Sequence, residues 1–397
     1  MRRVFRARWL LSIARPPIRD GWVATEKQVI VASGGPETLP ADALAEPILQ
    51  AAIVPGLVNA HTHLELSWMR GQVAPAPSMP GWVERLMALR RTVGHEPQLP
   101  IVEAIAEARA AGTTLVGDIT NTLAAYLPLA DSQISAAIFR ELLGFNTADP
   151  DSVVASVRSQ LEALPPVAWL RPSIVPHAPY SVSPELLRAI AAASNDRPVS
   201  IHLAESAEEM EFLQAGTGAW RSLLTDLRVW NEAWSPPGCS PVDYLEQHRL
   251  LHDRLVAVHC VQLGDADLRK LAHAGATVVT CPRSNRWTGA GRPPIERFYA
   301  SGVRVAIGTD SLASVEDLNV FGELALMREL APPIPARALL DSATRQGAAA
   351  LGFGDQLGTI EAGKRAELIA VAVPDAVSDV EEYLVSGITP DRIQWLA

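Results

Sequence analysis

The sequence has 397 residues, of which 48% are hydrophobic, so the chain can form one large α/β domain with a smaller addition. A formal net charge of -10 without a basic stripe argues against nucleic acid or an anionic membrane surface as a partner. No run approaches the ~20 apolar residues of a membrane helix. The three cysteines, Cys239, Cys260 and Cys281, are interpreted as free thiols in a reducing compartment. We therefore expect a cytoplasmic protein.

The two ends of the chain have similar patterns. Residues 1–53 contain short strand-like runs at 4–11, 21–24 and 28–32, separated by turn residues. Residues 355–397 contain a comparable run. Neither end is long enough to bury a core of its own, so both are predicted to combine into one small β-sandwich domain.

Residues 54–354 are predicted to form the second domain, in which strand-like runs alternate with helical patterns such as 101–111 and 186–193. This alternation is typical of a (β/α)8 TIM-type barrel. A doubly wound open sheet is the alternative, but no glycine-rich phosphate loop follows the first strand. The predicted strands are 53–60, 113–119, 135–141, 168–176, 198–203, 255–260, 276–281 and 303–309.

Polar side chains stand at the ends of several of these strands, where the active site of such a barrel lies. His61 and His63 are two residues apart, so a strand directs both to the same face. His202 ends the fifth strand and Asp310 follows the eighth. Imidazoles and a carboxylate suit Zn²⁺, with Fe²⁺ as the alternative metal. We therefore predict that these four residues bind one metal ion.

Catalytic roles are predicted for Glu205, His259 and Asp310 at the same end of the barrel. A bound ion lowers the pKa of water towards neutrality, and Asp310 can accept the proton released. Glu205 is placed to move protons to the leaving group. His259 is placed to orient the hydroxide or polarise the attacked atom, or to serve as a further metal ligand. A single strand-terminal histidine is more often structural, and an aspartate is often only a helix cap. A metal-binding scaffold without catalysis is a further alternative, against which the extra acid Glu205 argues.

At these residues the chain resembles the amidohydrolase superfamily, over nearly its whole length. The likeness implies a metal-dependent hydrolase on a distorted barrel, with a β-sandwich built from both termini. Many members bridge two metals with a carboxylated lysine, but no lysine lies between Lys27 and Lys270, which implies a mononuclear site as in the deaminase branch. The motifs that carry the likeness are residues 55–63, 202–205, 258–260, 281–285, 308–311 and 363–368.

Within that branch, residues 177–181 and 281–285 resemble the aminodeoxyfutalosine deaminases and the 5′-methylthioadenosine/S-adenosylhomocysteine deaminases. The resemblance implies hydrolytic removal of an amino group from an adenine-like ring, with release of ammonia. Arg91 stands where the second group has a glutamate that holds the ribose hydroxyls, nine residues after the tryptophan matching Trp82. This argues against the substrate of the second group, and residues 204–209 and 281–285 look closer to the first group, which acts in menaquinone biosynthesis, so we favour the first. A hydrolase of triazine or similar rings is the alternative within the superfamily.

The expected partner is a small-molecule substrate, and relatives of this kind are commonly homodimers or larger. Trp82 either lines the pocket or only anchors a helix, and Arg140 either contacts substrate or forms a structural ion pair. Arg283 either binds a substrate carboxylate or holds a loop. The residues predicted to bind substrate are Trp82, His177, Arg140, Arg283 and Glu205.

Overall fold

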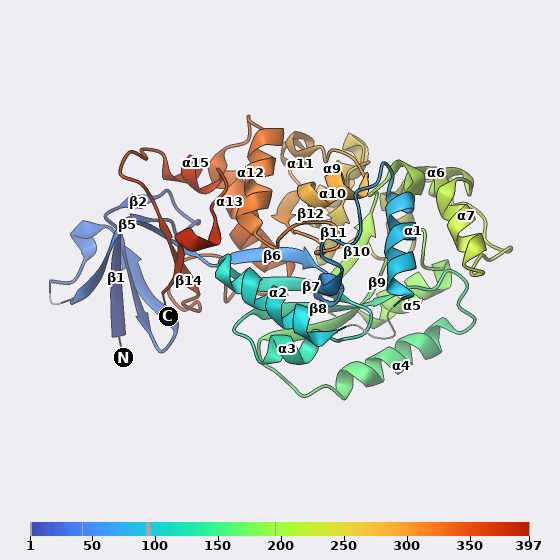
Figure 1. The fold of residues 1–397 in the computed structure, drawn as a ribbon, viewed down its shortest axis with the longest axis horizontal. Coiled ribbons are helices and arrows are strands. Elements are labelled where there is room, and N and C mark those ends of the chain that lie inside the picture. Colours follow the sequence, from blue (N-terminus) through green and yellow to red (C-terminus); the bar gives the residue numbers. More distant parts are fainter. Residues whose placement is uncertain (1, 42, 93–96, 195, 397) are drawn as a thin grey trace.

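The computed structural model describes residues 2–41, 43–92, 97–194 and 196–396. A sheet built from both ends of the chain lies beside a larger unit of parallel strands and helices (Figure 1). No helix among the described residues is long and apolar enough to cross a membrane.

The terminal sheet has seven strands in the order β15-β14-β5-β1-β3-β4, with β2 paired to β1. β14 runs antiparallel to β5, so that Ile369 lies opposite Val54. The described residues of both termini thus form one hydrogen-bonded sheet, which supports the predicted β-sandwich in part. The strands are β1 (Arg2–Leu10), β2 (Ile18–Arg19), β3 (Trp22–Glu26), β4 (Val29–Gly34), β5 (Ala45–Pro55), β14 (Leu368–Ala372) and β15 (Ile393–Trp395).

Among the described residues, eight further strands occur close to where the sequence predicts them, and all are largely buried. The first predicted strand, 53–60, is divided, because residues 53–55 belong to β5 of the terminal sheet and β6 begins at Leu57. They form two parallel sheets of four, in the orders β6-β7-β8-β9 and β10-β11-β12-β13. Their bounds are β6 (Leu57–Thr62), β7 (Thr113–Thr120), β8 (Ser135–Leu142), β9 (Leu170–Pro176), β10 (Val199–Leu203), β11 (Leu255–His259), β12 (Thr277–Thr280) and β13 (Arg304–Ile307).

The hydrogen-bonded strand pairing of a continuous eight-stranded barrel is interrupted at two places, between β9 and β10 and between β13 and β6. Between β9 and β10 the His202 amide donates to the His177 carbonyl at 2.9 Å. Between β13 and β6 the Asp310 amide donates to the His61 carbonyl at 3.0 Å. Pro176 ends β9 and has no N–H to donate, which contributes to the first interruption. The barrel is therefore distorted, and both interruptions adjoin the candidate site.

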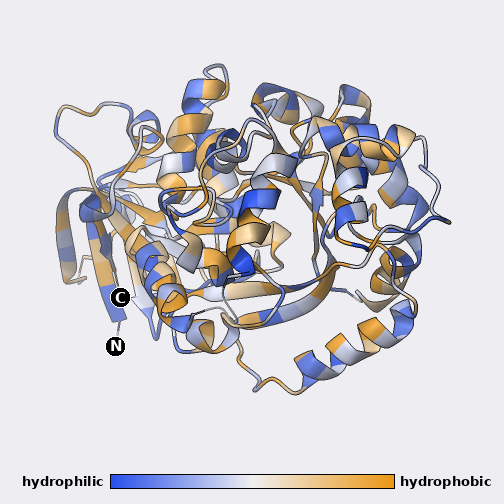
Figure 2. Cartoon of the chain, turned by 45° about the vertical axis from the view of Figure 1, so that its right-hand side comes forward, coloured by the Kyte–Doolittle hydropathy of each residue, from blue (hydrophilic) through white to orange (hydrophobic). Residues whose placement is uncertain are grey.

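Helices surround the parallel strands, and Figure 2 shows that many of them carry apolar and polar residues together. Side-chain caps begin several helices: Ser183 accepts from the Leu186 amide and Ser206 from the Glu209 amide. The helices are α1 (Met79–Arg90), α2 (Gln98–Ala110), α3 (Tyr126–Ala130), α4 (Pro150–Glu162), α5 (Pro184–Ala193), α6 (Ala207–Ala215), α7 (Ala219–Asp226), α8 (Pro241–Gln247), α9 (Asp265–His273), α10 (Pro282–Thr288), α11 (Ile295–Ser301), α12 (Val320–Leu330), α13 (Ala336–Asp341), α14 (Gly347–Ala350) and α15 (Val380–Leu384).

Gly308, just after β13, lies where the two parallel sheets meet. A Cβ at this position would lie 2.6 Å from Cβ and 2.9 Å from the carbonyl oxygen of His61. Because His61 is fully buried, it has no room to move away. We expect Gly308→Ala to lower the free energy of unfolding by about 1–3 kcal/mol and to weaken binding of the predicted metal ion. Thermal unfolding and metal analysis of the purified protein test this.

Gly81→Ala provides the control, because its added Cβ would meet only the flexible Ser78 hydroxyl, at 3.3 Å. This variant lies within helix α1, where alanine is favoured over glycine. Equal metal content and equal melting temperatures for the two variants would contradict the close packing inferred at Gly308.

Candidate metal and catalytic site

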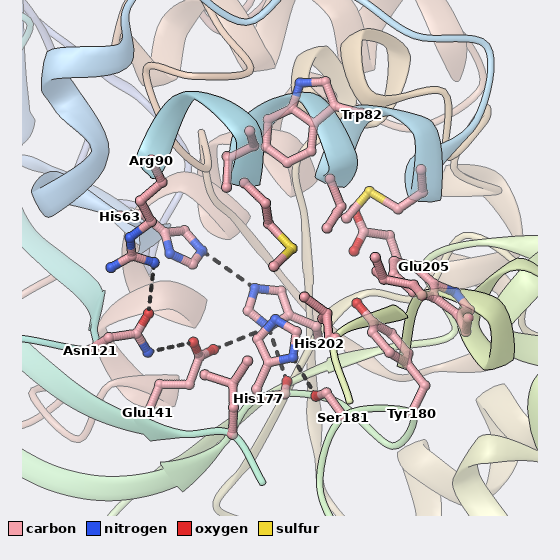
Figure 3. Close-up of a pocket in the computed structure, with 18 of the residues that line it drawn as sticks. His63, Trp82, Arg90, Asn121, Glu141, His177, Tyr180, Ser181, His202 and Glu205 are labelled. Carbon is pink, nitrogen blue, oxygen red and sulfur yellow. Dashed lines mark hydrogen bonds and ion pairs between the residues drawn. The ribbon is translucent and has the colours of Figure 1, made fainter. Parts of the chain in front are cut away.

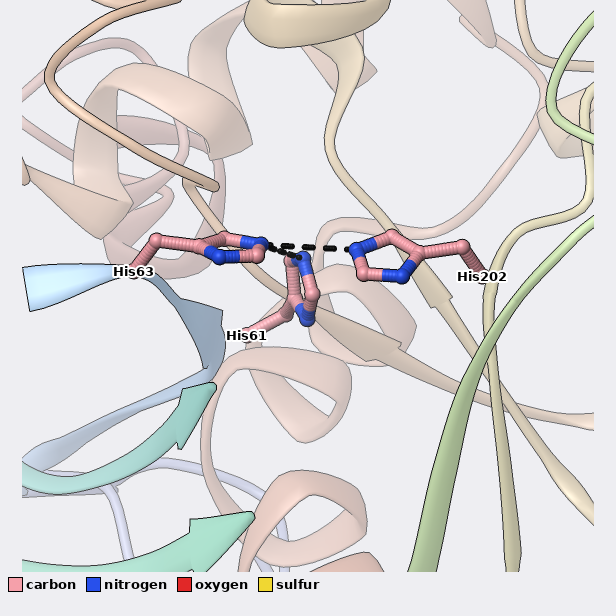
Figure 4. A group of neighbouring side chains, drawn as sticks. All are labelled: His61, His63 and His202. Atoms are coloured by element: carbon pink, nitrogen blue, oxygen red, sulfur yellow. Dashed lines mark hydrogen bonds between the residues drawn. The ribbon is translucent and has the colours of Figure 1, made fainter. Parts of the chain in front are cut away.

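Three imidazoles converge at the carboxyl ends of β6 and β10 (Figure 4). Nε2 of His63 lies 3.2 Å from Nε2 of His61 and 3.4 Å from Nε2 of His202. Tetrahedral Zn–N bonds of about 2.0–2.1 Å place ligand nitrogens about 3.3–3.4 Å apart. The spacing of these nitrogens therefore fits a divalent metal ion.

The protonation of the three rings also fits a metal. Burial lowers the pKa of His63 to about 3 and that of His202 to about 4, and it holds the pKa of His61 well below the usual range. Nδ1 of His202 lies 3.0 Å from the carbonyl oxygen of His177, an acceptor that leaves the Nε2 lone pair facing the cluster. The rings are thus neutral near pH 7, which is the state that binds metal.

Asp310 follows β13 and adds a carboxylate to this cluster. Its Oδ1 lies 3.8 Å from Nε2 of His61 and 3.5 Å from Nε2 of His63. The Ser284 hydroxyl donates to Oδ2 at 2.5 Å and the Ser311 amide to Oδ1 at 2.8 Å, which orients the carboxylate. Burial raises the pKa of Asp310, although these hydrogen bonds oppose the shift. The structure therefore brings together all four residues predicted to bind metal.

Left-handed backbone conformations occur beside these residues. Ala204, His259 and Asp310 have φ values of +47°, +71° and +65°, at or just after the ends of β10, β11 and β13. Non-glycine residues rarely adopt this region, and they cluster at functional sites. The turns end the strands sharply and help direct the polar side chains into the pocket.

Glu205 is only 2% exposed, and no hydrogen-bond partner for either carboxylate oxygen lies among the described residues. The Nε2 atom of His259 lies 3.6 Å from Oε1 of Glu205. Burial, with the nearby carboxylates of Asp310 and Glu209, raises the pKa of Glu205 well above the usual range. A buried acid that accepts no hydrogen bond from the described residues is suited to exchange a proton with a substrate.

Glu209 holds the turn that carries Glu205. Its two carboxylate oxygens accept from the backbone amides of Ala204 at 2.8 Å and Glu205 at 3.0 Å. Ser206 caps helix α6 through the Glu209 amide. This pair resembles a capping box whose glutamate reaches further back along the chain. Glu209 is therefore a positioning residue for Glu205, a role that the sequence analysis did not identify.

His259 lies beside the three imidazoles, and its ring centroid is 5.6 Å from that of His61 and 5.5 Å from that of His202. The side-chain amide of Asn285 lies 2.9 Å from Nδ1 of His259 and fixes the ring. Nε2 of His259 thereby faces Glu205. The geometry suits a residue that assists at the reacting atoms.

A cavity of about 620 Å³ opens over this cluster (Figure 3). Trp82 of α1 forms part of one wall, and His177 and Tyr180 follow β9 on another. The Tyr180 ring stacks on Trp220 of α7, with centroids 4.0 Å apart. Both Trp82 and His177 thus line the cavity, as the sequence analysis predicts for residues that bind substrate. A volume of this size holds a ligand larger than a single ring system.

A row of polar side chains forms another wall of the cavity (Figure 3). Nη1 of Arg90 donates to Asn121 at 3.4 Å, and Nδ2 of Asn121 donates to Glu141 at 3.0 Å. Glu141 in turn lies 3.4 Å from Nδ1 of His202. The row connects the C-terminal end of α1 to one of the candidate metal ligands.

Arg140, which the sequence analysis assigned to substrate, lies outside the described lining of this cavity. Its Nη1 donates to the Glu141 carbonyl oxygen at 2.6 Å. Side chains on a strand alternate between faces, and here Glu141, not Arg140, faces the cavity. Arg140 thus lies away from the cavity, and its hydrogen bond goes to a backbone carbonyl oxygen rather than to the carboxylate of the structural ion pair named as the alternative.

Arg283 also lies outside the described lining, in helix α10. Its guanidinium donates to Glu323 at 2.7 Å and to Asp317 at 2.7 Å, and it reaches the carbonyl oxygens of Asp317 and Asn319. These contacts hold the guanidinium outside the described cavity lining, so it is not placed to meet a substrate there. The second alternative for Arg283, that of holding a loop, matches this geometry.

The amidohydrolase family model matches residues 52–391, and the chain therefore belongs to the amidohydrolase family. It is a hydrolase that acts on C–N bonds, and its relatives are deaminases.

Two relatives share about a third of their residues with this chain. A 5-methylthioadenosine/S-adenosylhomocysteine deaminase of Desulforudis audaxviator is 31% identical, over 93% of this chain and 84% of the relative. An aminodeoxyfutalosine deaminase of Deinococcus radiodurans is 32% identical, over 84% and 81%. A solved adenosine deaminase of Xanthomonas campestris with bound zinc is 27% identical, with a TM-score of 0.81 over 98% of this chain and 90% of that structure.

Substitution of Glu209 tests its positioning role. Glu209→Gln keeps one acceptor but presents an amide N–H₂ to a backbone N–H, so the turn under Glu205 should shift. A misplaced catalytic group commonly costs about 10- to 100-fold in rate. We expect kcat to fall by about this factor with little change in KM, and the pH profile of kcat to move. Steady-state kinetics across pH measure both effects.

Glu208→Gln is the matched control, since Glu208 lies next to Glu209 in the first turn of α6 and forms no hydrogen bond with the described residues. A kcat loss in Glu208→Gln equal to that in Glu209→Gln would remove the argument for the buried carboxylate.

Proposed function

We propose that this protein is a metal-dependent aminohydrolase that removes an amino group from an adenine-like ring and releases ammonia. The main observation behind this proposal is the buried carboxylate of Glu205, which accepts no hydrogen bond from the described residues and lies beside three imidazoles with the spacing of a zinc site. A scaffold that only bound metal would gain nothing from such an acid, whose burial costs free energy.

We infer one zinc ion per chain, held by His61, His63, His202 and Asp310. A mononuclear site agrees with the sequence, which has no lysine between Lys27 and Lys270 to bridge a second metal. When bound, zinc supplies Lewis acidity that promotes the deprotonation of water.

The residues of the chain account for the remaining proton transfers. Asp310 is placed to accept a proton from the attacking water, and Glu205 to donate its own proton to the ring. The Glu205 carboxylate would then carry the proton of the added hydroxyl group to the departing amine, and the proton held by Asp310 would return to Glu205. The raised pKa of Glu205 keeps it protonated, and so able to donate, nearer to neutral pH than an exposed glutamate. His259 faces the same point and can orient the water. Trp82 and His177 supply flat surfaces against which a purine ring can lie.

The best specific substrate is aminodeoxyfutalosine, with a role in menaquinone biosynthesis. The alternatives are 5′-methylthioadenosine, S-adenosylhomocysteine or another purine nucleoside. The names of the two relatives support both groups about equally. Arg91 favours the first, because it stands where the second group has a ribose-binding glutamate.

The zinc-loaded protein should release ammonia from at least one 6-aminopurine nucleoside. Coupled ammonia detection over a panel of the candidate nucleosides measures this, and metal removal by a chelator should abolish the release. A zinc-replete protein that is inert on the whole panel would count against the proposal. Release of chloride from a chlorinated triazine instead would favour the alternative within the superfamily.

Glu205→Gln separates metal binding from turnover. The substitution is nearly isosteric and removes the proton that Glu205 exchanges, so we expect kcat to fall by about 10²- to 10⁴-fold. Metal analysis should still find one zinc per chain, since Glu205 is not a predicted ligand. Full activity in this variant would exclude Glu205 as the proton-transfer group.

A further inference from the structure

A second cavity, of about 430 Å³, lies where the terminal sheet meets the unit of parallel strands, near the C-terminus (Figure 1). Arg109, two residues before the turn into β7, and Trp169, directly before β9, line it from the parallel unit. This cavity therefore lies at the amino ends of the parallel strands, whereas the candidate metal ligands lie at their carboxyl ends. The two cavities share no lining residue among those that the structure describes.

The charge of the second cavity is opposite in sign to that of the whole chain, whose formal net charge is -10. The described lining contains four basic side chains but only one carboxylate, that of Glu367. Such a concentration of positive charge attracts anions. The basic side chains are Arg3, Lys27, Arg109 and Arg365.

Glu367 lies between two of these basic groups. One of its carboxylate oxygens accepts from Arg109 at 2.8 Å and the other from Arg365 at 3.1 Å. Burial lowers the pKa of Arg109, Glu367 opposes this shift, and Arg365 adds to it. One negative charge thus faces two positive charges, and an anion in the cavity would reduce the repulsion between them.

Further contacts hold the two guanidinium groups in place. The Arg109 guanidinium lies over the Trp395 ring, 3.1 Å from its centroid, and Arg365 donates to the Ser135 hydroxyl at 2.7 Å. Nη2 of Arg109 and Nε of Arg365 form no hydrogen bond with any residue that the structure describes. The pair is therefore fixed in position while donors remain for a ligand.

Lys27 adds a positive charge that is also not offset. It is exposed, and it has no hydrogen bond or ion pair with the part of the chain that the structure describes. With Gln28 it forms the turn between β3 and β4, where their φ values are +50° and +63°. A turn of this kind favours asparagine and glycine, so lysine is conformationally costly here.

Arg3 differs from Lys27, because Glu46 accepts two hydrogen bonds from its guanidinium, at 3.0 and 2.9 Å. The described lining thus retains two positive charges without a matching carboxylate, one from the pair around Glu367 and one from Lys27. A phosphate monoester carries nearly two negative charges at pH 7.

Trp169 provides a flat apolar surface in the same cavity. Its side chain is 37% exposed, and it forms no ring contact with the described aromatic residues. Nucleobases and similar rings stack on such surfaces. The cavity volume is also in the range of small-molecule sites and exceeds what a phosphate group alone would fill.

We propose that this second cavity binds a phosphate monoester that carries a flat ring, of about the size of a nucleoside monophosphate. The phosphate meets Lys27, Arg109 and Arg365, and the ring lies against Trp169. The site is separate from the candidate catalytic cavity, so the inference does not depend on the proposed deaminase function.

Uridine 5′-monophosphate is a suitable probe, because it lacks the adenine-like ring that the catalytic cavity is proposed to accept. Isothermal titration calorimetry of the zinc-loaded protein should give a Kd about tenfold lower for this nucleotide than for uridine or for inorganic phosphate. Added salt should weaken binding of the nucleotide.

Two variants assign the binding to this cavity. Lys27→Met removes a charge with no partner to disturb, and it should raise the Kd of the nucleotide about three- to tenfold. Trp169→Leu should weaken binding of the nucleotide about fivefold or more and leave that of inorganic phosphate unchanged, since only the ring contacts Trp169.

Arg158→Met is the matched control, because it removes one positive charge from an exposed position in α4, outside the lining of both cavities. It should leave the Kd of the nucleotide unchanged. The proposal is overturned if the nucleotide does not bind, if uridine binds equally well, or if Lys27→Met has no more effect than Arg158→Met. The last result would place the nucleotide elsewhere on the protein.

Discussion

One backbone hydrogen bond, from the Asp310 amide to the His61 carbonyl oxygen, underlies the geometry of the site. It joins the ends of β13 and β6, which belong to different parallel sheets. The same two residues supply a carboxylate and an imidazole to the candidate metal centre. Because both ligands lie next to this bond, the contact that holds the sheets together also sets the distance between ligands from opposite ends of the barrel unit.

Burial away from water shifts the pKa values of the side chains at the site in two opposite directions. It lowers the pKa of His61, His63 and His202, and it raises the pKa of Glu205 and Asp310. Both shifts favour uncharged side chains. The pocket thus avoids much of the cost of burying isolated charges, and it presents neutral imidazoles to a cation beside an acid, Glu205, whose pKa is raised.

Much of this arrangement could be predicted from the sequence, because strand periodicity and the position of polar residues at strand ends are local signals. His61, His63, His202 and Asp310 each follow an apolar run, and parallel strands bring such positions to one edge. The start of β5 at Ala45 was missed, since Pro47 reads as a break in a strand pattern. The single terminal sheet and the interrupted barrel depend on long-range hydrogen bonds that a sequence pattern does not report.

Substrate-binding residues were harder to predict than metal-binding ones. Arg283 stands in a recognisable motif, yet its guanidinium forms ion pairs with Glu323 and Asp317, which lie far along the chain. Arg140 and Glu141 are adjacent, and only the direction of each side chain decides which one faces the cavity. Asn121 lines the cavity and was not predicted to do so. Its position directly after β7, at the edge where polar residues gather, was the one sequence signal that could have indicated this role.

The pairing of β5 with β14 has a consequence for how the protein is made. β5 leads directly into β6, which carries His61, yet its antiparallel neighbour β14 is synthesised only after all the parallel strands from β6 to β13. During translation the edge of β5 that pairs with β14 stays unpaired while the ribosome synthesises the intervening polypeptide. This edge is largely apolar. Contacts of such high sequence separation slow folding and leave strand edges open to aggregation. The nascent chain is therefore a natural client for chaperones until its C-terminal strands emerge.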